Sequence, residues 1–211
     1  MIIPPGIWVS TDGSRLQGGD AGLFLDRDGV VVDEAGYLRR AQDVHIAKGA
    51  AELIAWANGL RIPVIVVSNQ SGIARGLFGW PDHEVVEREI VRMLAQRGAR
   101  IDLSLACPFH PDFTHGYSAE HAQWRKPGPG MLLHASGLLG LNLPRSWMIG
   151  DKASDVEAAR SAGLSACIHV LTGHGPEERD RAVTLASPTF QVLTANDMEA
   201  AIEVLKARFN L

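Results

Sequence analysis

Short runs of hydrophobic residues alternate along the chain with longer segments in which apolar residues recur at the helical period. This alternation is typical of strands joined by crossover helices in a parallel sheet. It predicts five core strands and a sixth near the end of the chain, over residues 23–25, 64–67, 101–106, 147–149, 166–170 and 190–193. We therefore expect an α/β fold with a mainly parallel central sheet.

Helical periodicity and end signals predict helices between these strands. The helices are expected over residues 49–57 and 81–97, from about residue 131, over 151–162 and over 196–209. Asn196 and Glu199 are spaced like a capping box at the start of the last helix. Residues 172–188 are expected to form a solvent loop. Residues 1–20 are expected to form an extension that adds an edge strand or contacts a partner, ahead of a main domain over 21–211.

Composition limits the classes of protein that fit this pattern. The chain has 211 residues, of which 46% are hydrophobic and 21% charged, so it can bury a core and is not intrinsically disordered. A net charge of -4 argues against nucleic-acid and membrane-surface partners, and no apolar run is long enough to cross a bilayer. The start of the chain lacks the pattern of a signal peptide. Only two cysteines, Cys107 and Cys167, fit a reducing compartment, so we expect the cytoplasm; the oligomeric state is not predicted.

The first predicted core strand ends in two carboxylates. Asp26 and Asp28 stand two positions apart and Gly29 follows, which lets the chain turn. In open parallel sheets the carboxyl ends of the strands form the ligand crevice, so these acids would lie at its mouth. On its own the motif is equally consistent with a solvated turn.

Other polar groups follow the ends of other predicted strands. Ser68, Asn69, Gln70 and Ser71 follow the second, where hydroxyl and amide groups can donate to phosphate oxygens. Gly150, Asp151, Lys152 and Asp155 follow the fourth, and Arg125 and Lys126 precede the helix near residue 131. All of these side chains could therefore converge on one crevice.

In this order, the motifs resemble those of the haloacid dehalogenase superfamily of phosphohydrolases. The strings DRDGV (26–30), SNQSGIARG (68–76), RKP (125–127) and GDK (150–152) are similar to one branch of it, which contains heptose bisphosphate phosphatases and histidinol phosphatases. The heptose branch is the nearer match. The resemblance implies a three-layer Rossmann-like fold, and the short segments 30–49 and 107–124 leave no room for a large cap domain.

The resemblance also implies a mechanism and a cofactor. Asp26 would attack phosphorus and form an aspartyl-phosphate, while Asp28 would carry the proton and Ser68 and Lys126 would neutralise phosphate charge. Bringing carboxylates to about 4 Å costs on the order of 4 kcal/mol per pair at an effective dielectric of 20. We therefore expect Mg²⁺ to be held by Asp26, Asp151 and the backbone carbonyl of Asp28, with Asp155 supporting from outside.

The substrate expected from the resemblance is a small phosphorylated sugar, with heptose bisphosphate as the first candidate. Its contacts are expected from Asp33, Tyr37, Ser68, Asn69, Gln70, Ser71, Arg75, Arg125, Lys126 and Lys152. Histidinol phosphate is the alternative substrate. A non-catalytic phosphoacceptor or binding module is the alternative class, but an acid two residues after the nucleophile favours a hydrolase.

The chain departs from this branch at its structural zinc site. Of the four cysteine and histidine positions, only Cys107 remains, and Phe109, Ala122 and Trp124 occupy the others. We therefore expect no structural zinc, since the tetrahedral set is incomplete. A rearranged site from Cys107, His110, His115 and His121 is the alternative.

Overall fold

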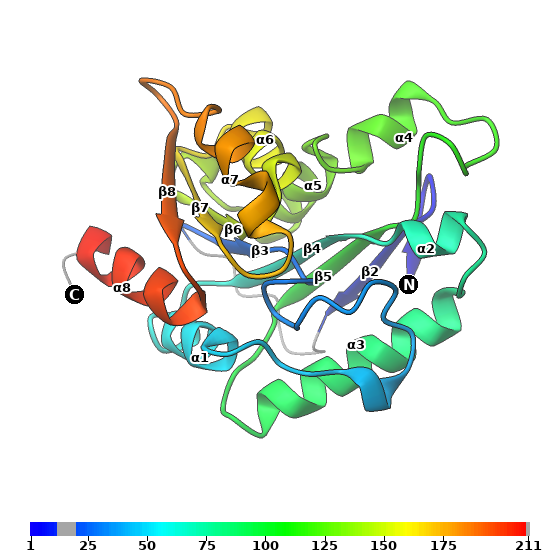
Figure 1. Ribbon diagram of the computed structural model, residues 1–211, viewed down its shortest axis with the longest axis horizontal. Coiled ribbons are helices and arrows are strands. Elements are labelled where there is room, and N and C mark those ends of the chain that lie inside the picture. Colours follow the sequence, from blue (N-terminus) through cyan, green and yellow to red (C-terminus); the bar gives the residue numbers. More distant parts are fainter. Residues whose placement is uncertain (12–19, 210–211) are drawn as a thin grey trace.

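The computed structural model describes residues 1–11 and 20–209. Within this part of the chain, eight strands form a single sheet in the order β1-β2-β5-β4-β3-β6-β7-β8 (Figure 1). The strands are β1 (Ile2–Ile3), β2 (Ile7–Thr11), β3 (Leu23–Leu25), β4 (Val64–Asn69), β5 (Leu103–Cys107), β6 (Trp147–Gly150), β7 (Ala166–Val170) and β8 (Gln191–Ala195). The six strands from β3 onward are parallel, which confirms the predicted sheet.

Helices connect the parallel strands and cover both faces of the sheet. They are α1 (Ala50–Gly59), α2 (Ser71–Ala74), α3 (Trp80–Ala95), α4 (Ala119–Trp124), α5 (Gly130–Leu139), α6 (Ala153–Ala162), α7 (Gly175–Val183) and α8 (Met198–Phe209), with 3₁₀ turns η1 (Ala41–Asp43) and η2 (Leu143–Arg145). In Figure 1, α1, α3 and α8 lie on one side of the sheet and α5, α6 and α7 on the other.

Alternating side chains of the central strand supply both cores. Leu23 and Leu25 of β3 belong to the cluster that packs with α1, α3 and α8, whereas Phe24 belongs to the cluster that packs with α5 and α6. A strand buried on both faces reads as a continuous hydrophobic run, and for this reason the parallel strands could be located from the sequence.

The order of the strands in the sheet creates a topological switch point at β3. β3 lies between β4 and β6, and the chain runs from β4 to β5 on one side and from β6 to β8 on the other. Crossovers that diverge in this way leave a crevice at the carboxyl ends of the strands. The connections 26–49 and 108–124 hold only short elements, in agreement with a fold that lacks a large cap.

Two sequence expectations about helices are wrong. Residues 172–188 contain the helix α7, with a proline in its first turn, Glu177 and Glu178 at its start and Ala182 buried against the sheet. The cap of α8 is Asp197 rather than Asn196, because the Oδ1 atom of Asp197 accepts a hydrogen bond from the Ala200 amide at 2.9 Å. Asp197 directly precedes the first helical residue, where a carboxylate reaches the free amides.

The beginning of the chain adds an antiparallel edge to the sheet. β2 pairs with β5, and β1 pairs with β2, so the edge-strand alternative for the extension is the observed one. Part of the extension, 12–19, lies outside the described residues. Within the described ranges no helix is both long and apolar enough to span a bilayer.

Candidate active site

Three carboxylates meet at the switch point of the sheet. Asp26 follows β3, Asp151 follows β6, and Asp155 lies in the first turn of α6. Each offers an oxygen within 4.8 Å of the others, and all three side chains are buried. The predicted convergence of Asp26 and Asp151 is therefore observed, and Asp155 lies in the same group rather than outside it.

Two glycines let the backbone come close to Asp151. A Cβ atom on Gly29 would lie 2.6 Å from the Oδ2 atom of Asp151, and one on Gly173 would lie 2.3 Å from it, and both glycines have positive φ. The close approach lets the His174 amide donate to this oxygen at 2.8 Å. The Nε2 atom of His169 donates to the Asp151 carbonyl at 3.0 Å, so the main chain of Asp151 is fixed as well.

Lys126 is the buried cation of the group. Its Nζ atom lies 2.8 Å from Oδ1 of Asp26 and 2.6 Å from Oδ1 of Asp155, and it donates to the Val67 carbonyl at 2.8 Å. Burial disfavours the charged ammonium, but Asp155 and Asp26 outweigh this cost and raise the pKa of Lys126. Lys126 thus holds a permanent positive charge beside the Asp26 carboxylate.

The carboxylate group fits a hard divalent cation. Oδ1 of Asp151 is buried and has no hydrogen-bond partner among the described residues. Burial, followed by the charges of Asp26 and Asp155, raises the pKa of Asp151 to about 8, so a bound cation would favour its ionised form. Because all the candidate ligands are oxygens, the set suits Mg²⁺ rather than a softer metal.

Asp28 lines a small pocket of about 40 Å³ together with Asp26 and Asp155, and neighbouring donors hold its side chain. Its two oxygens accept hydrogen bonds from the Nη2 atom of Arg27 at 2.9 and 3.0 Å, and Oδ2 accepts a further bond from the Gln70 amide at 2.8 Å. Gln70 also donates to the Ser68 hydroxyl at 2.7 Å. The side chain of Asp28 is therefore oriented by a charged and a neutral donor, outside the metal-binding group.

A cavity of about 280 Å³ opens beside Asp28. Its walls are Asp28, Glu34, Gly36, Tyr37, Asn69, Gln70, Ser71, Gly72, Lys152 and His174. Oε2 of Glu34 lies 3.7 Å from Nζ of Lys152 and 3.5 Å from Nε2 of His174. The cavity is therefore lined by groups of both charges.

Glu34 and His174 were missed by the sequence analysis. Glu34 belongs to the 33–37 loop, in which Asp33 and Tyr37 are the predicted contacts, but Asp33 is exposed and does not line the cavity. His174 follows the fifth parallel strand, in a segment without a recognised motif. The signal that could have found it is its position after a strand end, directly behind Gly173.

Three of the other predicted substrate residues, Arg125, Arg75 and Asn69, contact other groups of the protein. The guanidinium of Arg125 donates to the Phe109 carbonyl at 3.0 Å, and Arg75 lies 3.3 Å from Nε2 of His110 and stacks on Phe113. The Asn69 amide donates to the Lys126 carbonyl at 2.9 Å and so fixes the chain on which the buried ammonium is mounted. Tyr37 and Ser71 line the cavity directly.

In the described part of the chain, the three carboxylates are the one group of three or more possible metal ligands that lie close together. Cys107 is buried, and burial raises the pKa of its thiol to about 11, so it is not poised as a thiolate ligand. The expected lack of a structural zinc stays a prediction.

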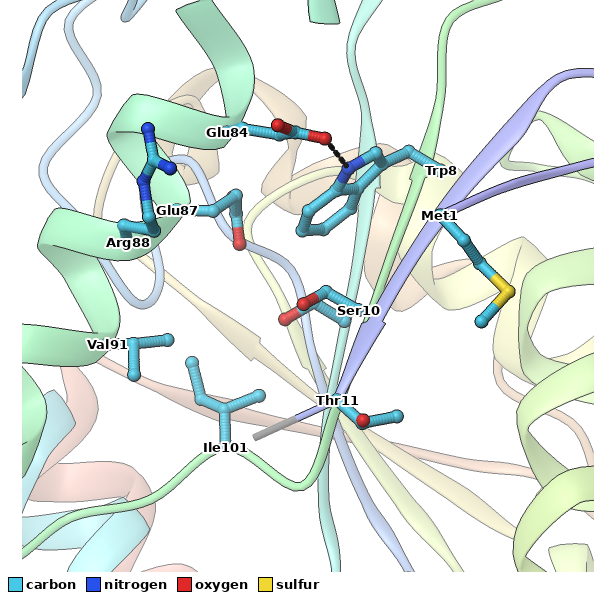
Figure 2. Close-up of a pocket in the computed structure, with 10 residues that line it drawn as sticks. Met1, Trp8, Ser10, Thr11, Glu84, Glu87, Arg88, Val91 and Ile101 are labelled. Atoms are coloured by element: carbon cyan, nitrogen blue, oxygen red, sulfur yellow. Dashed lines mark hydrogen bonds between the residues drawn. The ribbon is translucent and has the colours of Figure 1, made fainter. Parts of the chain in front are cut away.

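A second cavity, of about 390 Å³, lies between α3 and the antiparallel edge of the sheet (Figure 2). Glu84 accepts a hydrogen bond from the Trp8 indole at 3.2 Å across its rim, and Glu87 lines it from the same helix. None of the three clustered carboxylates lines this cavity, so it is separate from the site at the switch point.

The chain is similar in sequence to proteins of one hydrolase family. Residues 123–201 match the family model described as HAD-hydrolase-like. A Mesorhizobium japonicum protein named D-glycero-beta-D-manno-heptose-1,7-bisphosphate 7-phosphatase is 38% identical over 78% of this chain and 76% of its own. A Yersinia pestis protein of the same name is 32% identical over 89% of this chain and 96% of its own.

Two solved structures share the fold over most of their length. A HAD-like phosphatase from Mesorhizobium loti superposes with a TM-score of 0.84 and 32% identity, over 98% of this chain and 94% of its own. The D,D-heptose 1,7-bisphosphate phosphatase from B. bronchiseptica, crystallised with magnesium and phosphate, gives a TM-score of 0.76 and 30% identity over 89% of this chain and 99% of its own.

Proposed function

The chain belongs to the haloacid dehalogenase superfamily, in the branch of the heptose bisphosphate phosphatases, and we propose that it hydrolyses a phosphate monoester of a heptose bisphosphate. One observation carries the proposal. The Asp26 carboxylate is buried at the end of the central strand, 2.8 Å from the Lys126 ammonium and beside Asp151 and Asp155. This arrangement suits attack on a phosphoryl group rather than simple binding.

Asp26 acts as the nucleophile in the proposed first step. One of its oxygens attacks phosphorus in line with the leaving alkoxide, so that the P–O bond to the sugar breaks and an aspartyl-phosphate forms on Asp26. Asp28, protonated when the substrate binds, gives the alkoxide its proton and becomes a carboxylate. In the second step this carboxylate takes a proton from water, whose oxygen attacks phosphorus; the bond between phosphorus and Asp26 breaks, and inorganic phosphate leaves.

Charge on the transferring group is balanced by fixed groups of the site. Lys126 is held permanently charged beside Asp26, and Ser68 with the neighbouring 69–71 turn offers hydroxyl and amide donors to the non-reacting oxygens. Mg²⁺ would be held by Asp26 and Asp151 with the main-chain carbonyl of Asp28, with Asp155 beside them. When bound it supplies charge neutralisation between the carboxylates and the phosphate.

The substrate class is inferred from the relatives and from the cavity. Relatives are named for both the beta and the alpha anomers of the heptose bisphosphate, at 38% and 35% identity. We propose that the sugar lies in the cavity beside Asp28, with Lys152, His174 and Tyr37 as wall residues and Glu34 as a hydroxyl acceptor. Arg75 and Arg125 are proposed for the distal phosphate.

The test is phosphate release from a panel of esters with and without Mg²⁺. The panel contains both anomers of heptose 1,7-bisphosphate, histidinol phosphate and an aryl phosphate. We expect Mg²⁺-dependent release from a heptose bisphosphate with retention of the 1-phosphate, and loss of release in Asp26→Asn. Preference for histidinol phosphate would overturn the substrate assignment, and release by Asp26→Asn at the wild-type rate would overturn the mechanism.

Two further expectations stay predictions at this stage. A cytoplasmic location is expected from the cysteine content. The lack of structural zinc is tested by metal analysis of protein purified without added metal, in which a stoichiometric amount of zinc would contradict it.

A further inference from the structure

A buried arginine stands between the two aspartates of the first motif. Arg27 is 1% exposed, and its guanidinium faces Asp28. Its Nε atom donates to Oδ1 of Asp28 at 3.1 Å, and its Nη2 atom donates to Oδ1 and Oδ2 at 2.9 and 3.0 Å. This is the fork geometry in which two oxygens of a carboxylate are held at once.

The other side of the guanidinium is held by α3. Its Nη1 atom donates to Oε1 of Glu87 at 3.1 Å and lies 3.2 Å from Nδ1 of His83. Burial and the charge of Arg27 lower the pKa of His83 to about 2, so this ring is neutral and Nδ1 accepts. The hydrogen-bonding capacity of Arg27 is thus directed at three protein groups, which leaves it no role as a phosphate ligand.

A continuous set of hydrogen bonds therefore connects Glu87 on α3 to Arg27 and Arg27 to the side chain of Asp28. Glu87 is 6% exposed and lines the second cavity (Figure 2). Its Oε1 atom accepts the hydrogen bond from Arg27. Gln70 holds Asp28 from the opposite side, and Asp28 lines the cavity proposed for the sugar. A carboxylate held at both oxygens cannot rotate freely, and proton transfer depends on its orientation.

We propose that Arg27, supported by Glu87, is a positioning residue that holds the Asp28 carboxylate in the orientation required for proton transfer to the leaving oxygen. The inference rests on the proposed function, in which Asp28 is the proton donor. It assigns a role in the reaction to two side chains that bind Asp28 and each other, whereas the contact of Arg27 with the metal group is made by its backbone amide, which donates to Oδ1 of Asp26 at 2.7 Å. Lysine cannot replace Arg27 in this role, because an ammonium is not a planar fork.

The test compares two substrates with different leaving groups. An alkyl phosphate, the heptose bisphosphate, releases an alkoxide that needs a proton, whereas p-nitrophenyl phosphate releases a stable phenolate that does not. The ratio of kcat/KM for the alkyl ester to kcat/KM for the aryl ester reports on steps up to release of the alcohol. Partial unfolding of a variant affects both values equally and leaves this ratio unchanged.

In Arg27→Lys we expect kcat/KM for the alkyl ester to fall by about 100-fold, and in Glu87→Gln by about 10-fold, as loss of an oriented general acid implies. The aryl ester should change by less than about 3-fold in both variants, because its departure does not use the general acid. In an Asp28→Asn background, Glu87→Gln should cause no further change of the ratio, because the two side chains act through one group.

Glu84→Gln is the matched control. Glu84 lies one turn before Glu87 on α3 and lines the same cavity, but its contact is the Trp8 indole and not Arg27 (Figure 2). In Glu84→Gln, the ratio of kcat/KM for the alkyl ester to kcat/KM for the aryl ester should equal the wild-type ratio. Equal losses for both esters in the Arg27 and Glu87 variants, or no loss, would overturn the inference. Failure of the wild type to hydrolyse either ester would instead overturn the proposed function.

Discussion

Asp151 carries an electrostatic cost that a bound cation would remove. In the folded protein its pKa is raised from 3.8 to about 8, first by burial and then by Asp26 and Asp155. The folded state therefore binds more protons than the unfolded state between these two pH values, and the free energy of unfolding falls as the pH rises across this window. In the metal-free protein, Asp151 thus opposes folding most strongly from about pH 8 upward.

We expect Asp151→Asn to raise the free energy of unfolding of the metal-free protein by about 2 kcal/mol at pH 8 and by much less at pH 4.5. The amide oxygen of Asn can still accept from the His174 amide, so the gain reflects the lost charge. Urea titrations in EDTA at both pH values measure it. Addition of Mg²⁺ should raise the free energy of unfolding of the wild type and leave that of the variant unchanged. Stabilisation of the variant but not of the wild type would contradict this explanation.

The lowered pKa of His83 makes the free energy of unfolding depend on pH in the opposite direction. Its pKa is lowered from 6.5 to about 2, first by burial and then by Arg27, so below pH 6.5 the unfolded state binds the extra proton and stability is lost as the pH falls. When the pH is lowered from 7 to 4.5, the free energy of unfolding should fall by about 2 to 3 kcal/mol less in His83→Asn than in the wild type. Urea titrations at both values test this, with the exposed His45→Asn as the control. Equal losses in both variants would refute it.

At the scale of elements, α7 supports the helix that carries Asp155. The Oε2 atom of Glu178 accepts a hydrogen bond from the Ala153 amide at 3.1 Å, at the start of α6. A carboxylate at this place accepts a hydrogen bond from an amide that has no partner within the helix, and its negative charge interacts favourably with the positive end of the helix dipole. Glu178→Ala should therefore lower the free energy of unfolding by about 1 kcal/mol, as measured by urea titration. Glu177→Ala, with a side chain 83% exposed, should change it little; equal effects would contradict the cap.

The same helix shows where prediction from the sequence ends. The parallel strands could be located because Val64, Val66 and their neighbours are apolar on both faces, so the signal lies within each strand. Helix α7 is mostly polar, and its contacts come from α6 and the sheet, which no local pattern records. For this reason 172–188 looked like a loop.

The residues of the candidate site likewise fall into those that a local motif identifies and those that only tertiary contacts identify. Asp26, Asp151 and Lys126 could be assigned because each stands at a strand end or in a recognisable motif. The position of Asp155 within the carboxylate group and the contact of Arg27 with Glu87 depend on how distant segments meet. Sixty positions separate Arg27 from Glu87, and only the packing of α3 against the loop after β3 brings them together.

At the scale of the whole molecule, one hydrophobic cluster joins the antiparallel edge to the parallel strands of the sheet. Ile7 of β2 is fully buried in the same core cluster as Cys107 and Cys167. Cys107 ends β5, the strand next to β2, whereas Cys167 lies in β7, on the far side of β3. Burial raises the pKa of Cys107 to about 11 and also raises that of Cys167, so both thiols are protected from labelling until the chain opens.

Ile7→Ala should cost about 3 kcal/mol by leaving a cavity in this core, which corresponds to an approximately 100-fold increase in the population of the open form. If the edge and the parallel strands form one cooperative unit, labelling of Cys107 and Cys167 by a disulfide reagent at pH 8 should accelerate by the same factor. Ile2→Ala, at a position 52% exposed, should leave both rates unchanged. Acceleration of Cys107 alone would mean that β2 opens locally with β5, and that the parallel core around the carboxylates is stable without it.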